Sequence, residues 1–302
     1  MRLHLGTTLL GRDGNPLSAQ GAMERARAIE AAGFDGIWMG DAIGGPKRPD
    51  PLMWLLVQAA AAPTLEVGTC ILIVPLREPI ALAQSLLTLH ALTRGRFTVG
   101  VGTGGPQPTA YELVGRGEEW PRRFTIMTQV LDRMRQVFDG ELSGPRGITP
   151  WPSVVGGPPI LIGAYASGIW VRRAARKYDG WVASAGRTDA RTLAEGIKRF
   201  RDAGGRRAVV CSVFFDLVGP RVPLADDRPF QIQCGPEEAA ERLAYLAEIG
   251  FDDVILPKRQ QGLAYYEPDI TAEELHTLRS LVPKDTRPRP WQERSEAPAA
   301  RP

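Results

Sequence analysis

Short apolar runs alternate with longer amphipathic segments along most of the chain. The short runs have the length of buried strands, and the longer segments repeat apolar positions with the period of a helix. The predicted strands are 3–7, 36–40, 66–74, 96–101, 159–163, 180–184, 208–216 and 253–257. The predicted helices are 19–32, 51–62, 79–92, 121–138, 168–177, 189–203, 236–249 and 272–282. This alternation predicts a parallel α/β fold.

One joint between a helix and a strand occurs twice. Residues 33–35 and 250–252 both read Gly-Phe-Asp, and each follows a helical pattern that ends at the glycine, as at a C-terminal cap. Eight strand–helix pairs favour a closed (β/α)8 TIM barrel. An open doubly wound sheet would have about six strands and a glycine fingerprint after the first strand. This chain has Thr-Thr-Leu-Leu at 7–10 instead.

Several segments fall outside the simple alternation. We expect insertions at 41–50 after the second strand, at 139–158 after the fourth strand–helix pair, and at 217–235 before the seventh helix. The barrel domain is expected to span residues 1–282. Residues 283–302 combine proline and charge without an apolar period, so a mobile tail is predicted there.

Composition narrows the class of protein. The net charge of +3 is mild and no long run of like charges occurs, so no nucleic-acid partner is expected. The three cysteines and three histidines form no C-x-x-C or H-E-x-x-H pattern, so no metal site and no disulfide framework are predicted. The chain shows neither a signal-peptide layout nor an apolar stretch of about 18 residues, so no membrane span and a cytoplasmic location are expected.

Ligands of such barrels bind at the C-terminal ends of the strands. Two strand ends are rich in small residues, 102–105 and 163–168. Glycines at the first could let a flat ring or a phosphate approach the backbone, or they could form a tight barrel corner. At the second, Ser167 could donate to a phosphate at a helix N-terminus, or it could only cap that helix.

Several motifs in these regions resemble the bacterial luciferase-like superfamily of flavin- and deazaflavin-dependent oxidoreductases. The resemblance covers residues 1 to about 282. The motifs are AGFDGIWMGD (32–41), LEVGT (65–69), PLREP (75–79), ALAQ (81–84), GRFTVGVGTG (95–104), PPILIG (158–163) and RRAARKYDGW (172–181).

The resemblance implies a TIM barrel with FMN or coenzyme F420 across its mouth. It implies a bulge after the third strand, with a non-prolyl cis peptide bond at Cys70–Ile71, that backs the cofactor ring. The end of the fourth strand would border the cofactor, Arg77 would lie near it, and the turn after the fifth strand would hold its phosphate. The candidate cofactor-binding residues are Thr8, Cys70, Ile71, Arg77, Gly102, Thr103, Gly104, Gly163, Ala164, Ser167 and Gly168.

The predicted activity is that of an oxidoreductase or monooxygenase, which transfers a hydride or activates oxygen on an unidentified small organic substrate. The sugar-phosphate dehydrogenases of the family carry a His and a Glu where this chain has Ala42 and Gly105, so that substrate class is not expected. The candidate catalytic residues are Asp41, Tyr111 and Glu112. For Asp41, a purely structural role in anchoring the 41–50 loop is the alternative.

Two other functions remain open from the sequence. One is a family member that binds the cofactor without turnover. The other is a cofactor-free barrel enzyme that binds a phosphorylated substrate and uses Lys258. Family members are commonly homodimers, and the helix at 79–92 is apolar around most of its circumference, as expected of a helix buried on more than one side. A flavin or deazaflavin reductase is a further expected partner.

Overall fold

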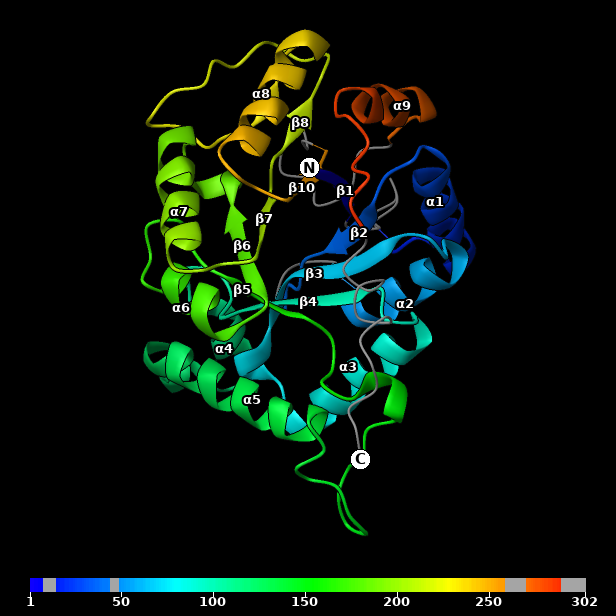
Figure 1. Ribbon diagram of the computed structural model, residues 1–302, viewed down its shortest axis with the longest axis vertical. Helices are drawn as coiled ribbons and strands as arrows, with labels where there is room; N and C mark the ends of the chain where they lie inside the picture. The colour runs from blue at the N-terminus through cyan, green and yellow to red at the C-terminus, as the bar shows by residue number, and fades with distance from the viewer. Residues whose placement is uncertain (8–14, 44–48, 259–269, 289–302) are drawn as a thin grey trace.

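Eight parallel strands close into a barrel in the computed structural model, which describes residues 1–7, 15–43, 49–258 and 270–288. The order around the barrel is β1-β10-β7-β6-β5-β4-β3-β2 (Figure 1). The strands are β1 (Arg2–Gly6), β2 (Gly36–Met39), β3 (Glu66–Ile73), β4 (Phe97–Gly102), β5 (Ile160–Gly163), β6 (Gly180–Ser184), β7 (Arg207–Cys211) and β10 (Asp253–Pro257). The predicted (β/α)8 TIM barrel is therefore confirmed.

Helices surround the barrel because each carries one apolar face that packs against the strands (Figure 1). The α-helices are α1 (Ala19–Ala31), α2 (Pro51–Ala61), α3 (Pro79–Leu92), α4 (Thr109–Leu113), α5 (Arg123–Phe138), α6 (Trp170–Lys177), α7 (Ala190–Asp202), α8 (Pro236–Glu248) and α9 (Ala272–Ser280). Short 3-10 helices lie at η1 (Val74–Leu76), η2 (Gly117–Arg122), η3 (Pro152–Val154) and η4 (Ala185–Arg187). No helix among the described residues is long and apolar enough to cross a membrane.

The repeated Gly-Phe-Asp joint has the expected geometry. Gly33 and Gly250 follow α1 and α8 with φ angles of 86° and 112°, in the left-handed region that glycine adopts most easily. Their amides donate to the carbonyl oxygens of Glu30 and Ala247. Both glycines therefore end a helix and turn the chain into the next strand, as the sequence predicts.

The predicted strand at 208–216 is wrong as a single element. β7 stops at Cys211, and Ser212 follows with a left-handed φ of 57° that an extended strand cannot contain. The chain resumes as β8 (Phe215–Asp216), which pairs with β9 (Ile232–Gln233) in a separate two-stranded sheet. The apolar run continues through the break because both pieces are buried, so hydrophobicity alone did not reveal it.

The beginning of the predicted tail contacts the amino end of the barrel. The Asp285 carboxylate lies 3.8 Å from the terminal amine of Met1, and Arg2 donates to the carbonyl oxygen of Pro288.

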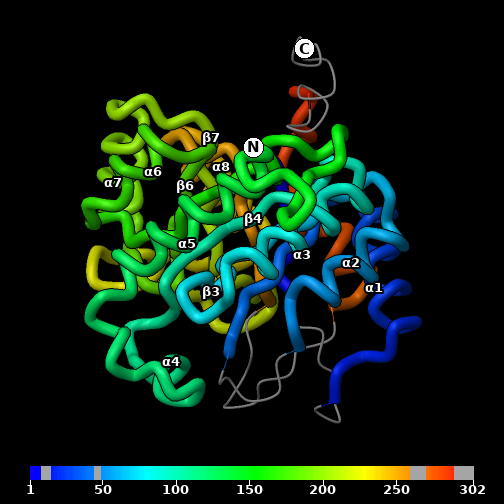
Figure 2. Tube along the Cα trace, turned by 90° about the horizontal axis from the view of Figure 1, so that it is seen from below, coloured from blue at the N-terminus to red at the C-terminus, as the bar shows by residue number. Residues whose placement is uncertain are grey.

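The N-terminus and α4 lie at opposite ends of the molecule in Figure 2. Because α4 follows the carboxyl end of β4, it marks the end of the barrel at which a ligand is expected.

Candidate active site

A bulge interrupts the pairing of β3 with β4. The register runs from Thr69 opposite Val99 to Leu72 opposite Val101, so Cys70 and Ile71 are the irregular residues. The peptide bond between Cys70 and Ile71 is cis. The cis bond expected from the family resemblance is thus confirmed. Both side chains are half-buried, whereas the strand residues before them are buried.

Ile71 lies over two glycines from neighbouring strands. A β carbon at Gly102 would lie 2.8 Å from Ile71 Cδ1, and one at Gly163 would lie 2.6 Å from Ile71 Cγ2. Real β carbons essentially never approach so closely. The space above both glycines is therefore taken by a side chain of the protein. Three of the sequence candidates meet here and form a smooth apolar wall at the carboxyl ends of β3, β4 and β5.

The end of β4 is held by Tyr111 of α4. The Tyr111 hydroxyl donates to the carbonyl oxygen of Thr103 at 3.1 Å, and its ring packs edge-on against Trp120. Burial raises the pKa of Tyr111 to about 12, although nearby arginines oppose the shift. Gly104 follows with a φ of 90°. Tyr111 is fully buried, while its neighbour Glu112 is exposed, so only Glu112 of these two candidates is open to solvent.

Asp41 connects the end of β2 to the bulge. Its backbone amide donates to the carbonyl oxygen of Ile71 at 3.0 Å, and its Oδ2 accepts from the amide of Ile73 at 3.1 Å. The same oxygen lies 2.9 Å from Arg77 Nη2, and the carboxylate side chain is only 3% exposed. Arg77 also approaches Asp50 at 3.4 Å. Asp41 and Arg77 therefore hold the bulge in place. The alternative raised from the sequence, anchoring of the 41–50 loop, involves residues 44–48, which lie outside the described residues.

The turn between β5 and α6 contains the predicted phosphate-binding residues. The amide of Ala164 donates to Val182 and that of Gly168 donates to Tyr165, so both are engaged by protein carbonyls. The predicted helix at 168–177 begins later, at Trp170, and no side chain caps its first turn. Ser167 is exposed and is not that cap. The capping alternative for Ser167 is therefore wrong.

Other strand ends complete the mouth. Thr8 lies outside the described residues. Lys258, after β10, forms an ion pair with Glu274 at 2.7 Å and is thus occupied by a carboxylate of α9. Cys211 is the last residue of β7 and Ser212 follows it, and neither was a candidate from the sequence. The strand was predicted to continue to residue 216, so its true end at Cys211 was not recognised as part of the mouth.

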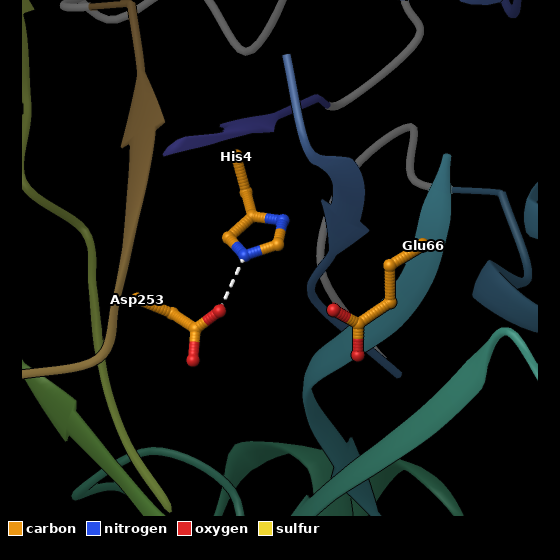
Figure 3. A group of neighbouring side chains, drawn as sticks. All are labelled: His4, Glu66 and Asp253. Atoms are coloured by element: carbon orange, nitrogen blue, oxygen red, sulfur yellow. Dashed lines mark hydrogen bonds and ion pairs between the residues drawn. The ribbon is translucent and has the colours of Figure 1, made fainter. Parts of the chain in front are cut away.

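Charged groups gather at the opposite, amino end of the barrel (Figure 3). His4, Glu66 and Asp253 are the one group of three potential metal ligands among the described residues. Arg207 lies 2.8 Å from Glu66 and 2.9 Å from Asp253, and His4 Nε2 lies 2.8 Å from Asp253. The carboxylates are thus held by cationic and imidazole groups of the chain.

These contacts decide the charge states of the network. Burial alone would raise the pKa of Glu66 and of Asp253, but the Arg207 guanidinium outweighs it and lowers both. The two carboxylates in turn keep the pKa of Arg207 well above its usual value despite its burial. The network is therefore an ionised plug in the barrel floor, remote from the mouth.

Comparison with known proteins agrees with the fold. Residues 3–217 match the family model of the luciferase-like monooxygenases. An uncharacterized protein of Mycobacterium tuberculosis is 30% identical over 232 residues, covering 71% of this chain and 73% of that protein. The F420-dependent glucose-6-phosphate dehydrogenase of Mycolicibacterium fortuitum is 28% identical over 203 residues, covering 62% of this chain and 60% of that enzyme.

Two solved structures show the same architecture. An F420-dependent secondary alcohol dehydrogenase, in complex with an F420-acetone adduct, superposes with a TM-score of 0.69 at 16% identity, covering 93% of this chain and 98% of that chain. The oxygenating constituent of the Pseudomonas putida 3,6-diketocamphane monooxygenase, in complex with FMN, gives 0.68 at 15% identity, covering 85% and 91%. Because the family model spans most of the chain, this protein belongs to the luciferase-like monooxygenase family.

Proposed function

We propose that this protein is an oxidoreductase that binds FMN or coenzyme F420 at the carboxyl end of its barrel. The observation that carries the proposal is the seating of Ile71 over Gly102 and Gly163. It makes the Ile71 side chain an apolar wall at the bottom of the mouth, and an apolar wall suits the face of a flat ring. The relatives include enzymes named for F420 and one solved with FMN, so both cofactors are candidates.

The chain's own residues divide the work of holding the cofactor. Ile71 would support the ring, and the backbone at Thr103 and Gly104 would border it. Ser167, exposed beside the first turn of α6, which no side chain caps, would donate to a phosphate, because the positive end of the helix dipole favours an anion there. The bound cofactor would carry the electrons of a two-electron transfer.

The bulge is positioned before any cofactor binds. Asp41 accepts from the Ile73 amide and pairs with Arg77, which fixes the chain on both sides of Ile71. A wall held in this way costs little further ordering when a ring binds to it. We assign Asp41, Arg77 and Tyr111 positioning roles on this ground. Glu112 is the exposed acid–base candidate of the three proposed from the sequence.

The substrate is proposed to be a small organic molecule without a phosphate. The two positions at which the sugar-phosphate dehydrogenases of the family carry a His and a Glu are Ala42 and Gly105 here. Nothing lies within 4 Å of a β carbon built at Gly105, so that position offers space and no acid–base group. The cationic Lys258 is already paired with Glu274. Sugar-phosphate oxidation and a lysine-dependent, cofactor-free reaction are therefore both disfavoured.

A homodimer is proposed across the outer face of α2 and α3. A groove of about 700 Å³ lies between these helices, lined in part by Leu52, Met53, Leu56 and Leu89. Met53 is 74% exposed and lies beside the other apolar side chains of this groove, so together they form an apolar surface that a second copy could cover. Analytical ultracentrifugation of the wild type and Met53→Glu would test the dimer, and we expect the variant to be monomeric.

We further propose a cytoplasmic location. If the cofactor is FMN, we also propose a separate reductase that supplies reduced flavin.

Separate titrations with FMN and coenzyme F420, oxidised and reduced, test the cofactor. Binding is followed by quenching of cofactor fluorescence or, for the reduced forms, by calorimetry. We expect one cofactor to bind in the micromolar range or tighter, and Gly163→Ala to weaken it at least tenfold. If neither cofactor binds below high-micromolar concentrations, the proposal is wrong. Binding without turnover of any substrate, with a reductase present, would favour a non-catalytic family member.

A further inference from the structure

Two thiols meet inside the barrel. Cys70 lies in the β3 bulge and Cys211 is the last residue of β7, two strands separated by three others on either side of the closed sheet. Cys70 nevertheless packs against the interior cluster that contains Cys211, and its thiol is near enough to act on the pKa of Cys211. The contact therefore spans the inside of the barrel, just below its mouth.

Cys211 has a second polar neighbour. The Ser212 hydroxyl donates to Cys211 Sγ at 3.7 Å, from a residue whose φ is 57°. This left-handed conformation is uncommon for a residue with a side chain and marks a position that its surroundings enforce. The neighbouring Cys70 thiol, together with the hydrogen bond from Ser212, lowers the pKa of Cys211 even though burial opposes ionisation.

The third cysteine differs in both respects. Cys234 lies between β9 and α8, and the groups that act on its thiol are charged side chains such as Arg242 and Glu238 and not a second cysteine. Burial raises the pKa of the Cys234 thiol. Because the thiolate is the reactive form of cysteine, Cys211 should react with oxidants before Cys234 does. The chain thus contains its own control cysteine.

The surroundings of the pair favour redox chemistry over metal binding. The interior cluster around Cys211 is apolar, with Leu161, Val182 and Ile255 among its members. Among the described residues, the only group of three side chains that could hold a metal ion lies at the amino end of the barrel, so the two sulfur atoms here lack a third ligand. Structural zinc sites require four ligands.

We propose that Cys70 and Cys211 form a peroxide-sensitive redox pair in the wall of the mouth. The Cys211 thiolate attacks one oxygen of hydrogen peroxide, the O–O bond breaks, and a sulfenic acid and water result after protonation. The Cys70 sulfur then attacks the sulfenic sulfur, an S–S bond forms, and the hydroxyl leaves as water with the Cys70 proton. Overall, two thiols lose two electrons and two protons, and one peroxide becomes two waters.

The disulfide would change the wall of the mouth. Its sulfur atoms lie about 2.05 Å apart, closer than in a thiol hydrogen bond, so Cys70 must move toward β7. The bulge lacks regular pairing with β4, but Asp41 holds it through Ile71 and Ile73, so the movement of Cys70 works against these contacts. Cys70 is bonded to Ile71, which rests on Gly102 and Gly163. Oxidation therefore displaces Ile71.

The test uses the purified full-length protein. It is treated with up to about five equivalents of hydrogen peroxide, denatured, alkylated and weighed by mass spectrometry. We expect a loss of about 2 Da, protection of two of its three cysteines from alkylation, a 70–211 cross-linked peptide, and reversal by dithiothreitol. The Cys234→Ser variant should behave as the wild type does.

Single variants separate the two steps. Cys70→Ser should leave a sulfenic acid on Cys211 that dimedone traps, and Cys211→Ser should form neither product. Ser212→Ala should slow oxidation about two- to fivefold, because a smaller fraction of Cys211 is then ionised. Thermal unfolding of each variant shows whether it is folded.

Three outcomes on the wild-type protein would overturn the proposal. The first is three unmodified thiols after treatment. The second is oxidation of Cys234 as fast as Cys211. The third is conversion of Cys211 to the sulfinic acid without a 70–211 bond. None of these depends on a variant or on bound cofactor, so the result is independent of the proposed oxidoreductase activity.

Discussion

Ile71 lies against Gly163 so closely that a β carbon at position 163 would approach Ile71 Cγ2 to 2.6 Å. The contact joins a residue of the β3 bulge to the last residue of β5, with β4 between them. One isoleucine therefore requires glycine on two successive strands. This relation gives the mouth its apolar wall and makes that wall sensitive to single methyl groups.

Gly163→Ala and Gly102→Ala should respond differently to a change at position 71. Each alanine overpacks Ile71 and should cost about 1–3 kcal/mol of unfolding free energy. Ile71→Val removes Cδ1, which a β carbon at 102 would meet at 2.8 Å, but keeps Cγ2, which one at 163 would meet. The valine should therefore largely relieve Gly102→Ala and leave Gly163→Ala destabilised.

Denaturant unfolding of the single and double variants measures this coupling. Gly21→Ala is the matched control, since its new methyl group would make only ordinary contacts at 3.6 Å within α1. That control should be neutral or stabilising by up to about 1 kcal/mol. Equal relief of both alanines by Ile71→Val would contradict the proposed seating.

The Asp41–Arg77 pair should matter far more than the Asp50–Arg77 pair. Asp41 is nearly buried and also accepts from the Ile73 amide, whereas Asp50 is partly exposed and 3.4 Å from Arg77. Asp41→Asn should cost about 1.5–3 kcal/mol and weaken cofactor binding, because a charged hydrogen bond is lost. Asp50→Asn should cost under about 0.5 kcal/mol, since exposed pairs contribute little and asparagine also caps helices.

Unfolding free energies and cofactor dissociation constants of both variants test this difference. Asp50 caps α2 through the amides of Leu52 and Met53, and asparagine can accept the same bonds. If Asp41 were instead an acid–base residue, as is proposed for Glu112, Asp41→Asn would leave the unfolding free energy unchanged and lower only turnover. That pattern would show that Asp41 acts on the substrate and not on the bulge.

Tyr111→Phe and Glu112→Gln should separate a positioning residue from an acid–base candidate. Tyr111 is buried, neutral at working pH with a pKa of about 12, and bonded to Thr103. Its phenylalanine variant should lose about 1 kcal/mol of stability and keep the shape of the pH–rate profile. If Glu112 transfers a proton, Glu112→Gln should lower kcat about 100-fold or more and remove one limb of that profile.

The buried network at the barrel floor should make the protein sensitive to acid. Arg207 holds the folded-state pKa values of Asp253 and Glu66 below their usual 3.8 and 4.5. The unfolded chain therefore binds more protons as the pH falls through about 4. The stabilisation is complete above about pH 5 and is lost progressively below it, as the pH approaches the folded-state values.

Asp253→Asn should lower the melting temperature at pH 7 and flatten its fall between about pH 5 and 3. Arg207→Met should cost about 3–5 kcal/mol at pH 7, because it removes the guanidinium that pairs with both buried carboxylates and leaves only the 3.6 Å contact of Arg2 with Asp253. Glu195→Gln, which removes an exposed pair with Arg191, is the control and should change neither quantity. An equal fall of the melting temperature between about pH 5 and 3 in Asp253→Asn and in the wild type would contradict the prediction.

The sequence by itself determined the barrel and the place of its mouth. Apolar runs of strand length and apolar positions with a helical period can be recognised in the sequence, because the burial of those residues drives folding. The joints at Gly33 and Gly250 could also be predicted from neighbouring residues alone, because a left-handed residue after a helix favours glycine wherever it occurs. The cis bond at Cys70–Ile71 came from the family resemblance and not from such patterns.

Only the tertiary structure decided which groups meet. Ile71, Gly102 and Gly163 are far apart in sequence, and their fit depends on strand register. The Cys70–Cys211 contact joins strands on opposite sides of the barrel, and the ionised plug joins four strand starts. The break after Cys211 was hidden because buried residues continue on both sides of it. Such contacts depend on distances that no local pattern of apolar and polar residues encodes.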